Sequence, residues 1–395
     1  MTLSSSSYDV LLVGGGVMGC ATAYYLLKAD PRLNVALIEM DATFARASTP
    51  LSDGNTRLQF NIPENIAMSQ YGLEVLQTFA DDMAVDGDRP DPAFRQQGNL
   101  FIIDEDSREG ALEGLAQQQR LGCAVEWLTP EQVQEKYPIY NLKDCVGGTF
   151  GRLDGTMSPL AVLLGYKKKA QAMGAHWIDG KVTQLLTEAG RVTGVQLASG
   201  ETLTAPVVVN TAGAWAAELA RTAGIDLPVL PIKRQVTVFE TPVHFEHVLP
   251  LLFLPSGLYV IHEGGKHFMA ARSFDDDPIT TEDFEWHRHH FEDLIWEELV
   301  SYIPVFDRLK ITGGWAGLYE VNPFDGNAIL GEWPELKGFY LENGYSGHGF
   351  QQCHAVGRYI TELILGQTPT LDLSIFSPQR ILDNQPVFEN KRKII

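Results

Sequence analysis

The chain has 395 residues, 45% of them hydrophobic and 20% charged, including 19 Phe, 13 Tyr and 7 Trp. This composition predicts large packed cores in two or three domains and excludes a globally disordered chain. The formal net charge of −20 argues against nucleic acid or an anionic membrane surface as a partner.

Four scattered cysteines without a CxxC spacing indicate reduced thiols and a cytoplasmic location; they are Cys20, Cys123, Cys145 and Cys353. The uncharged stretch Val10–Leu27 is long enough to suggest a membrane span, but it contains four glycines. A buried strand, a turn and a helix explain it better, so we expect no membrane span.

Residues 1–7 are expected to be an irregular start. A βαβ unit follows, with the predicted elements Tyr8–Val13, Val17–Lys28 and Asn34–Ile38. The connection after the first strand carries the spacing G-x-G-x-x-G, formed by Gly14, Gly16 and Gly19. In this context the glycines allow a tight turn, close approach of a diphosphate and close packing of helix on strand. Glu39 ends the second strand, where a carboxylate would bind a ribose hydroxyl. The motif alone does not separate NAD from FAD.

Farther along the chain, the pattern predicts a helix that begins at Pro63, and the helices Arg108–Arg120, Leu160–Met173, Glu282–Tyr302 and Gln351–Leu365. A small antiparallel meander is predicted before the buried strand Val207–Asn210, with strands Val182–Thr187, Arg191–Leu197 and Glu201–Leu203. Such a meander is unlike an ordinary nicotinamide-binding domain.

Four further segments resemble one family of flavoenzymes. They are Ser48–Phe60 (STPLSDGNTRLQF), Val207–Trp215 (VVVNTAGAW), Gly314–Gly331 (GWAGLYEVNPFDGNAILG) and Gly338–Gln351 (GFYLENGYSGHGFQ). Together with the glycine motif they resemble the FAD-dependent D-amino-acid oxidase and sarcosine oxidase superfamily. Within it, RLQFNIPENIAMS is most similar to the FAD-dependent oxidoreductase-domain proteins.

The resemblance implies an α/β fold. A Rossmann-type (GR2-like) FAD-binding domain would be discontinuous, over residues 1–88, 151–224 and 325–395. A second α+β domain, over 89–150 and 225–324, would carry an antiparallel sheet and bind substrate. Some members hold FAD through a cysteine just before the segment matched by Gly317, or through a histidine in the loop after the second strand. This chain has neither residue there, so we expect non-covalent FAD.

The same matches imply which residues contact FAD. They are Gly14, Gly16, Val17, Met18, Gly19, Glu39, Ser48, Thr56, Arg57, Val182, Ala212, Gly213, Trp215, Gly317, Gly347, His348, Gly349, Phe350 and Gln351. The glycines before Gln351 would form an anion-binding concavity at a helix N-terminus.

Four residues are predicted to act in catalysis: Arg57 as a cation over the flavin, Tyr319 to orient substrate, His348 beside the flavin, and Arg272. Arg272 or Arg234, on predicted strands of the second domain, could grip a substrate carboxylate through a bidentate pair. For each arginine, an ordinary salt bridge within the sheet is an equally good interpretation. The alternative for His348 is a structural hydrogen bond.

The chain departs from the sarcosine oxidases at three positions. Phe60 and Gln351 replace the two cations that grip the substrate carboxylate, and Met269 replaces a lysine that assists the reaction with O2. These differences argue against a sarcosine-like substrate and efficient oxidase behaviour. Glu285, His287, His289 and His290 cluster on one predicted helix, but no third ligand is evident, so no metal site is predicted.

The leading functional hypothesis is oxidation of the C–N bond of an amino acid or a secondary amino acid, N-substituted or imino. A hydride would pass to flavin N5 and the resulting imine would hydrolyse. The electron acceptor would be O2 or another molecule. Three alternatives remain open: a flavin-dependent 2-hydroxy-acid dehydrogenase, a non-catalytic FAD-bound assembly protein and a nicotinamide dehydrogenase.

Overall fold

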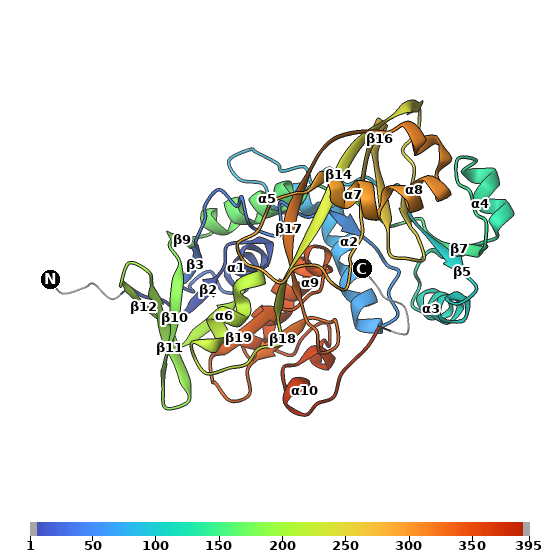
Figure 1. Ribbon diagram of the computed structural model, residues 1–395. Helices are drawn as coiled ribbons and strands as arrows, with labels where there is room; N and C mark the ends of the chain where they lie inside the picture. Colours follow the sequence, from blue (N-terminus) through green and yellow to red (C-terminus); the bar gives the residue numbers. More distant parts are fainter. Residues whose placement is uncertain (1–5, 390–395) are drawn as a thin grey trace.

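The computed structural model describes residues 6–389, and its backbone forms two large sheets with helices packed around them (Figure 1). The first sheet has six strands in the order β18–β19–β13–β2–β3–β9. Their bounds are Ile329–Glu332, Phe339–Asn343, Val207–Asn210, Val10–Val13, Val35–Glu39 and His176–Asp179. All its pairs are parallel except β18 with β19, as the βαβ prediction requires.

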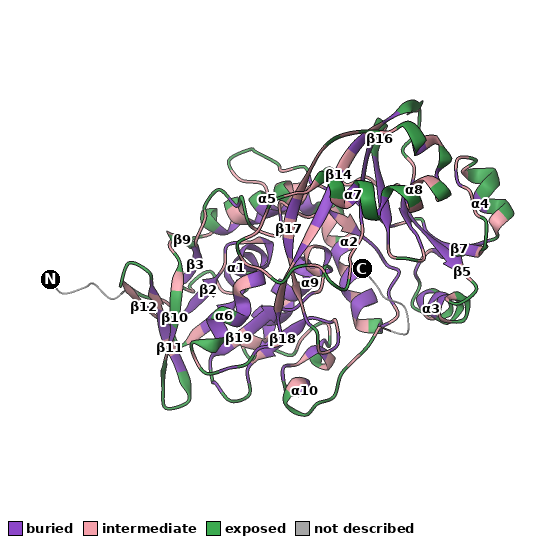
Figure 2. Cartoon of the chain, viewed as in Figure 1, coloured by how far each residue is buried: buried purple, intermediate pink, exposed green. Residues whose placement is uncertain are grey.

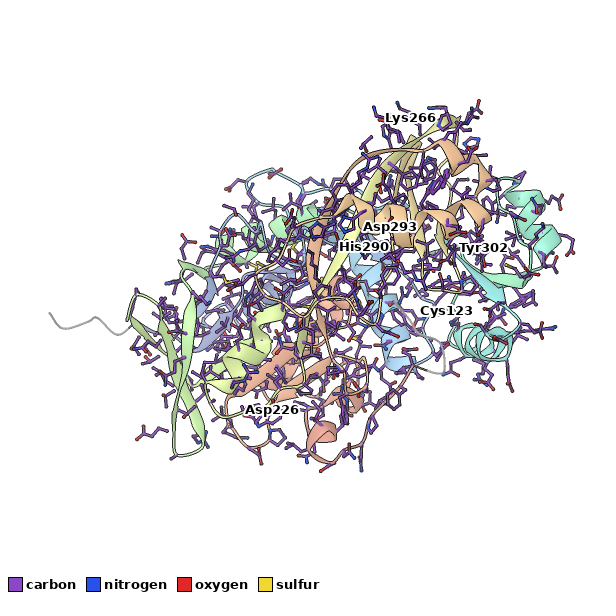
Figure 3. The ribbon with its side chains drawn as sticks, viewed as in Figure 1. Cys123, Asp226, Lys266, His290, Asp293 and Tyr302 are labelled. Atoms are coloured by element: carbon purple, nitrogen blue, oxygen red, sulfur yellow. The ribbon has the colours of Figure 1, made fainter. Side chains whose placement is uncertain are left out.

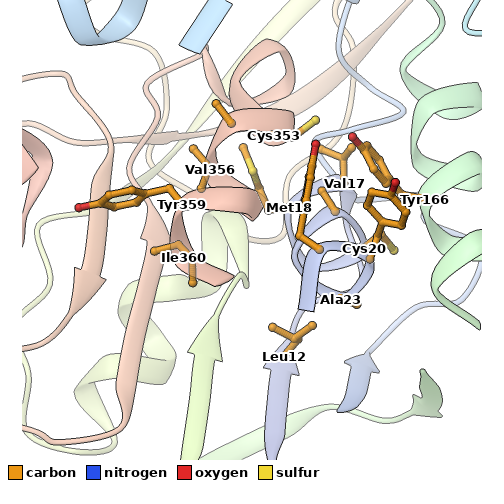
Figure 4. Close-up of a cluster of buried hydrophobic side chains, with 14 of the residues drawn as sticks. Leu12, Val17, Met18, Cys20, Ala23, Tyr166, Cys353, Val356, Tyr359 and Ile360 are labelled. Atoms are coloured by element: carbon orange, nitrogen blue, oxygen red, sulfur yellow. The ribbon is translucent and has the colours of Figure 1, made fainter. Parts of the chain in front are cut away.

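Helices cover the six-stranded sheet and form its core. α1 (Val17–Ala29) packs against α9 (Gly349–Ile364) and α5 (Pro159–Ala172), and α9 packs against α2 (Pro63–Asp82). Figure 4 shows the apolar cluster around α1, with Met18 toward Cys353 and Val356 of α9 and Cys20 beside Tyr166 of α5. Figure 2 shows α1, α9 and the inner strands among the buried parts of the molecule. This packing fixes the N-terminal ends of α1 and α9.

The second sheet has seven strands in the order β17–β14–β16–β15–β5–β7–β6. Their bounds are Lys310–Val321, Leu230–Phe245, Tyr259–Ala271, Leu251–Phe253, Asn99–Asp104, Cys145–Gly151 and Val125–Leu128. All pairs are antiparallel except β15 with β5. The associated helices are α3 (Arg108–Arg120), α4 (Pro130–Lys136), α7 (Arg288–Leu294), α8 (Trp296–Tyr302) and the 3-10 helix η2 (Pro304–Arg308). Aromatic side chains from the sheet and these helices form its core, including Phe239, Phe268, Phe291 and Phe306.

The predicted meander is present in a separate four-stranded sheet. Its strands are β1 (Ser6–Ser7), β12 (Thr202–Thr204), β11 (Arg191–Leu197) and β10 (Val182–Glu188). Ser6–Ser7 pairs with β12, so the expectation of an irregular start was wrong for these two residues, and residues 1–5 lie outside the described part. The shorter elements are β4 (Asn55–Thr56), β8 (Gly155–Thr156), α6 (Ala216–Arg221), α10 (Gln379–Leu382) and the 3-10 helices η1 (Gly213–Trp215) and η3 (Ser374–Phe376).

The α/β fold class with a second, antiparallel-containing unit is confirmed. The strands of the seven-stranded sheet come from residues 99–151 and 230–321. The domain boundaries at 88, 150, 224 and 324 stay predictions.

One predicted helix was wrong. Instead of a helix over Glu282–Tyr302, the chain is extended before His287, and two short helices, α7 and α8, follow. The extended part is held along β14 because Asp283 accepts from the Lys233 ammonium at 2.7 Å and the His287 N–H donates to Gln235 Oε1 at 2.7 Å. These tertiary contacts outweigh the local helix propensity.

Candidate active site

The turn between β2 and α1 has glycines where no side chain would fit. A Cβ at Gly14, which has φ +117°, would lie 2.2 Å from the Thr211 carbonyl oxygen. A Cβ at Gly19 would lie 2.1 Å from the Gly14 carbonyl oxygen. The turn therefore lies against β13 and the first turn of α1, and the N-terminus of α1 faces the adjoining cavity.

Glu39 lies at the end of β3, facing the same turn. Its carboxylate accepts hydrogen bonds from the Gly15 N–H at 2.7 Å and the Asp41 N–H at 2.9 Å. Only 8% of the residue is exposed, and burial raises the pKa of this carboxyl group. The two backbone donors fix the carboxylate at the cavity wall, where it can accept from a hydroxyl.

A cavity of about 370 Å³ extends from this turn along α1. α1 has glycine as its N-cap residue, so no side chain caps its first N–H groups and they can bind an anion. Ten of the predicted FAD contacts line this cavity: Gly14, Gly16, Val17, Met18, Glu39, Ser48, Val182, Ala212, Gly213 and Trp215.

A second cavity of about 110 Å³ adjoins the first, because Val17, Met18, Ser48, Thr49 and Glu320 line both. Predicted site residues that line it include Gly317, Tyr319, Gly347, Gly349 and Phe350. At its edge α9 begins at Gly349, again without a side-chain cap. A Cβ at Gly347 would lie 2.6 Å from the Tyr319 ring.

The long cavity, its glycine turn, an acceptor carboxylate and two uncapped helix N-termini fit a dinucleotide with an attached ring system. No described cysteine lines either cavity, in keeping with a cofactor held without a covalent bond. Gly19 and Thr56 line neither cavity. Gly19 packs on Gly14, and Thr56 pairs with Gly155.

A third, smaller cavity of about 30 Å³ continues from the second and is lined by Arg57, Tyr319, His348 and Gln351. Arg57 is only 5% exposed, and burial lowers the pKa of its guanidinium to about 10. The guanidinium lies 4.8 Å from the ring centre of Phe60 and 5.6 Å from that of Phe253. A cation is therefore held rigidly at the end of the cavity system.

Two residues that the sequence analysis did not single out lie in the same place. Asp53 and Tyr259 line both the second and the third cavity. The Tyr259 hydroxyl faces the Asp53 carboxyl group and lowers its pKa, in opposition to burial, and Tyr319 faces Tyr259 in the same cavities. Burial raises the pKa of Asp53 and raises that of Tyr319 to about 12. A carboxyl group, two phenols and a guanidinium thus converge on one cavity.

The two arginines proposed to grip a carboxylate lie in different environments. Arg272 lines none of these three cavities, and its Nη1 donates to Glu298 Oε2 at 2.9 Å. The structure therefore does not bring Arg272 to the site, and it supports the alternative of a salt-bridged sheet arginine. Arg234 does line the second cavity, but its guanidinium is paired with Asp277 and the Phe274 carbonyl.

The three residues at which the chain differs from the sarcosine oxidases also lie in different environments. Gln351 lines the third cavity, and its Oε1 accepts from the Arg57 N–H at 2.8 Å. Phe60 is fully buried in an apolar cluster with Leu58 and Ile66, so it packs in the core. Met269 is buried in β16 in a cluster with Tyr259.

The predicted cluster of Glu285 and three histidines lies just before and at the start of α7. His290 lies on α7, beside the seven-stranded sheet (Figure 3), and burial lowers the pKa of its imidazole. Within residues 6–389, no group of three or more His, Cys, Asp or Glu side chains is placed to hold a metal ion. No helix in that range has the length and apolar character that crossing a membrane requires.

Comparison with known proteins identifies the family. The model of the family described as FAD dependent oxidoreductase (DAO) matches residues 9–363. FAD-dependent oxidoreductase domain-containing protein 1 of Bos taurus is 33% identical, covering 93% of this chain and 83% of its own. Glycine oxidase of Pseudomonas putida is 30% identical, covering 94% and 99%.

Among solved structures, the L-proline dehydrogenase of P. horikoshii superposes with a TM-score of 0.85 at 23% identity. The match covers 97% of this chain and 100% of the other. The chain belongs to the FAD dependent oxidoreductase family: it is an oxidoreductase, and its cofactor is non-covalent FAD. The readings as a non-catalytic assembly protein and as a nicotinamide dehydrogenase are thereby set aside.

Proposed function

We propose that this FAD-dependent oxidoreductase oxidises the C–N bond of an amino acid or of a secondary amino acid. The proposal rests mainly on one observation. The third cavity, which continues from the second, is lined by Asp53, Tyr259, Tyr319 and Arg57 together. A carboxylate and a guanidinium in one small cavity complement a zwitterion, which carries an ammonium and a carboxylate. Relatives whose names point the same way include a glycine oxidase and a sarcosine oxidase subunit.

The glycine turn, Glu39 and the N-terminal ends of α1 and α9 would hold FAD. When bound, FAD would supply the two-electron oxidant, which accepts a hydride from the carbon next to nitrogen. The chain prepares the substrate for this step. Asp53 accepts a proton from the substrate ammonium, so that the nitrogen lone pair becomes available.

Tyr259 and Tyr319 hold the Asp53 carboxylate and the substrate nitrogen in register through their hydroxyl groups. Arg57 attracts the substrate carboxylate, and the rings of Phe60 and Phe253 around it keep its guanidinium in place. His348 lies edge-on to Phe60, with ring centres 5.3 Å apart, which favours a positioning role. The imine product would leave the site and hydrolyse in water to a carbonyl compound and an amine or ammonia.

The decisive experiment is an anaerobic titration of the purified yellow protein with primary amino acids, N-methyl and cyclic amino acids, and 2-hydroxy acids. We expect an amino acid to bleach the flavin absorbance, with stoichiometric release of amine or ammonia. Bleaching by 2-hydroxy acids alone would replace this function with hydroxy-acid dehydrogenation. Bleaching by no member of the panel would contradict the proposed substrate class.

Two further properties belong to the same proposal. The electron acceptor is O2 or another molecule, which reoxidation of the bleached protein with air and with an artificial acceptor distinguishes. All four cysteines are free thiols in the structure, which supports a reducing compartment such as the cytoplasm.

A further inference from the structure

The first cavity carries an unusual charge for a site that binds a diphosphate, because acidic side chains outnumber cations in its lining. Among the described residues lining it are five acids, Glu39, Asp41, Glu218, Glu320 and Glu342, and two cations, Arg46 and Lys181. An ionised carboxylate beside a diphosphate is destabilising unless a cation or a set of donors compensates it. Each acid therefore needs a physical explanation.

Three of the acids are explained by their surroundings. Glu39 accepts from two backbone N–H groups and is placed for a ribose hydroxyl. Asp41 accepts from the Thr43 N–H and hydroxyl. Glu218 is exposed on α6. The two acids that remain to be explained are Glu320 on β17 and Glu342 on β19.

Glu342 lies under α1, and only 1% of the residue is exposed. Its Oε1 accepts from the Thr22 hydroxyl at 2.7 Å. Its Oε2 is buried and has no hydrogen-bond partner among residues 6–389. A buried carboxyl oxygen without a partner is costly, and a protonated one has a hydrogen to donate. Because the side chain lines the cavity, the bound cofactor is the available acceptor.

Glu320 faces the same space from the other large sheet. It lines the first and the second cavity, and its Oε2 accepts from the Gly344 N–H at 3.1 Å. The titratable groups that face Glu342 are Glu320 from β17, Tyr345 from the loop before α9, and Cys353 from α9. From α1 it faces the uncharged Thr22. None of these groups can supply a positive charge. Burial raises the pKa of both carboxyl groups to about 8.

We propose that Glu320 and Glu342 are neutral carboxylic acids at neutral pH, and that Glu342 donates a hydrogen bond from Oε2 to an oxygen of the ribityl–diphosphate part of FAD. Deprotonation removes that donor and places a negative charge beside the diphosphate. FAD affinity is therefore coupled to a proton, and it falls as the pH rises. This inference rests on family membership and is independent of the substrate.

The test measures FAD binding by the apo-protein in the absence of any substrate. The dissociation constant is obtained from the quenching of FAD fluorescence at pH values from 6.5 to 9.5. We expect the wild-type dissociation constant to increase with pH, approaching about tenfold per pH unit above the carboxyl pKa for one coupled proton.

The variant Glu342→Gln keeps an amide donor that does not titrate in this range. It should bind FAD about as tightly as the wild type at pH 6.5 and lose most of the pH dependence. Glu320→Gln should reduce the dependence by relieving the repulsion without removing the donor. Glu188→Gln, at an exposed carboxylate on β10, is the matched control and should follow the wild type.

A wild-type dissociation constant that does not change with pH would overturn the proposal. So would a Glu342→Gln variant with the same pH dependence as the control. If that variant does not fold, infrared spectroscopy of the wild-type holoprotein decides. We expect the carbonyl band of a buried protonated carboxylic acid at pH 7, and its absence would refute the neutral state.

Discussion

Asp53 is half-buried and lines two cavities together with Tyr259. Because Asp53→Asn keeps the size of the side chain but removes the proposed proton acceptor, kcat/KM for the proposed amino-acid substrate should fall about 100-fold or more. The acidic limb of the pH profile of kcat/KM, which reports ionisation of this group, should disappear. Steady-state kinetics from pH 5 to 9 provide the measurement.

Tyr259→Phe is the matched comparison for Asp53. It removes one hydroxyl partner but leaves the carboxyl group, so the loss in kcat/KM should be smaller and the acidic limb should remain. An Asp53→Asn variant with wild-type kcat/KM would show that the carboxyl group takes no proton from the substrate.

The residues of the site illustrate what a sequence can and cannot reveal. Glu39 was predicted because a carboxylate at the end of the second strand has a fixed relation to the glycine turn. Asp53 lies inside a quoted motif but has no spacing signature of its own, and Tyr259 comes from a strand 206 positions farther along the chain. Only the pairing of β16 with β15 and β14 brings that tyrosine to the cavity.

Arg272 shows the opposite error. It directly follows β16 in the seven-stranded sheet, where a carboxylate clamp was expected, but side-chain direction alternates along a strand. Its guanidinium meets Glu298 and not the cavity. A shift of one residue decides whether a side chain at this point faces the cavity or the opposite side of the sheet, and a single sequence does not reveal that shift.

At the scale of elements, the glycine turn and α1 act as one unit, because Gly19 packs directly on Gly14. In Gly19→Ala the added Cβ would lie 2.1 Å from the Gly14 carbonyl oxygen. The turn must move, at a cost of about 1–3 kcal/mol, and the uncapped N–H groups of α1, which are proposed to bind the FAD phosphates, move with it. We expect a lower melting temperature of the apo-protein and loss of most bound flavin, measured as the ratio of flavin to protein absorbance.

Gly110 in α3 gives a matched control for this substitution. It is also a helical glycine, and a Cβ there meets nothing within 4 Å. Gly110→Ala should retain flavin and gain about 0.5–1 kcal/mol of stability from helix propensity alone. If Gly19→Ala binds flavin as Gly110→Ala does, close packing at the turn is not what shapes the cofactor site.

Elements with strong local signals were predicted well. The helix Arg108–Arg120 and the strand Val207–Asn210 have the predicted bounds, because hydrophobic periodicity and flanking turn residues mark both. β9 was missed because only its two middle residues are even half-buried. The predicted helix over Glu282–Tyr302 was wrong because Lys233 and Gln235 of β14 hold its first part extended.

At the scale of the whole molecule, the C-terminal segment is tied to the sheet core by one buried ion pair. Arg380 Nε donates to Asp325 Oδ2 at 2.7 Å, and the two side chains are 5% and 0% exposed. Arg380→Met would leave the Asp325 carboxylate buried without its charge partner, at a cost of about 3–5 kcal/mol in the free energy of unfolding.

Urea denaturation of the apo-protein measures this cost. The control is Arg32→Met, which removes the exposed pair of Arg32 with Asp30 and should leave stability nearly unchanged. Equal effects of the two substitutions would mean that the buried pair does not hold the C-terminal segment in place.

Buried groups also set the pH dependence of stability for the apo-protein as a whole, and two kinds act in opposite directions. Glu320 and Glu342 have folded pKa values raised from 4.5 to about 8. Between these values the folded state binds more protons than the unfolded state, so stability falls as the pH rises. His354 donates to or accepts from the Tyr166 hydroxyl at 2.6 Å, and burial lowers its pKa from 6.5 to about 4. Between those values the unfolded state binds more protons, so stability rises with pH.

The two effects overlap below pH 6.5, and only the carboxyl groups act above it. Below pH 6.5 the two carboxyl groups outweigh the one imidazole. Stability of the apo-protein should therefore be greatest near pH 4.5, fall by about 1.4 kcal/mol per pH unit up to pH 6.5, and fall about twice as steeply from there toward pH 8. Urea denaturation at pH values from 4.5 to 9 tests this. Glu342→Gln should make the decline shallower, and His354→Gln should make it steeper between pH 4.5 and pH 6.5. A stability that does not fall between pH 6.5 and pH 8 would mean that these carboxyl groups are ionised in the folded apo-protein, and the proton-coupled binding of FAD would lose its basis.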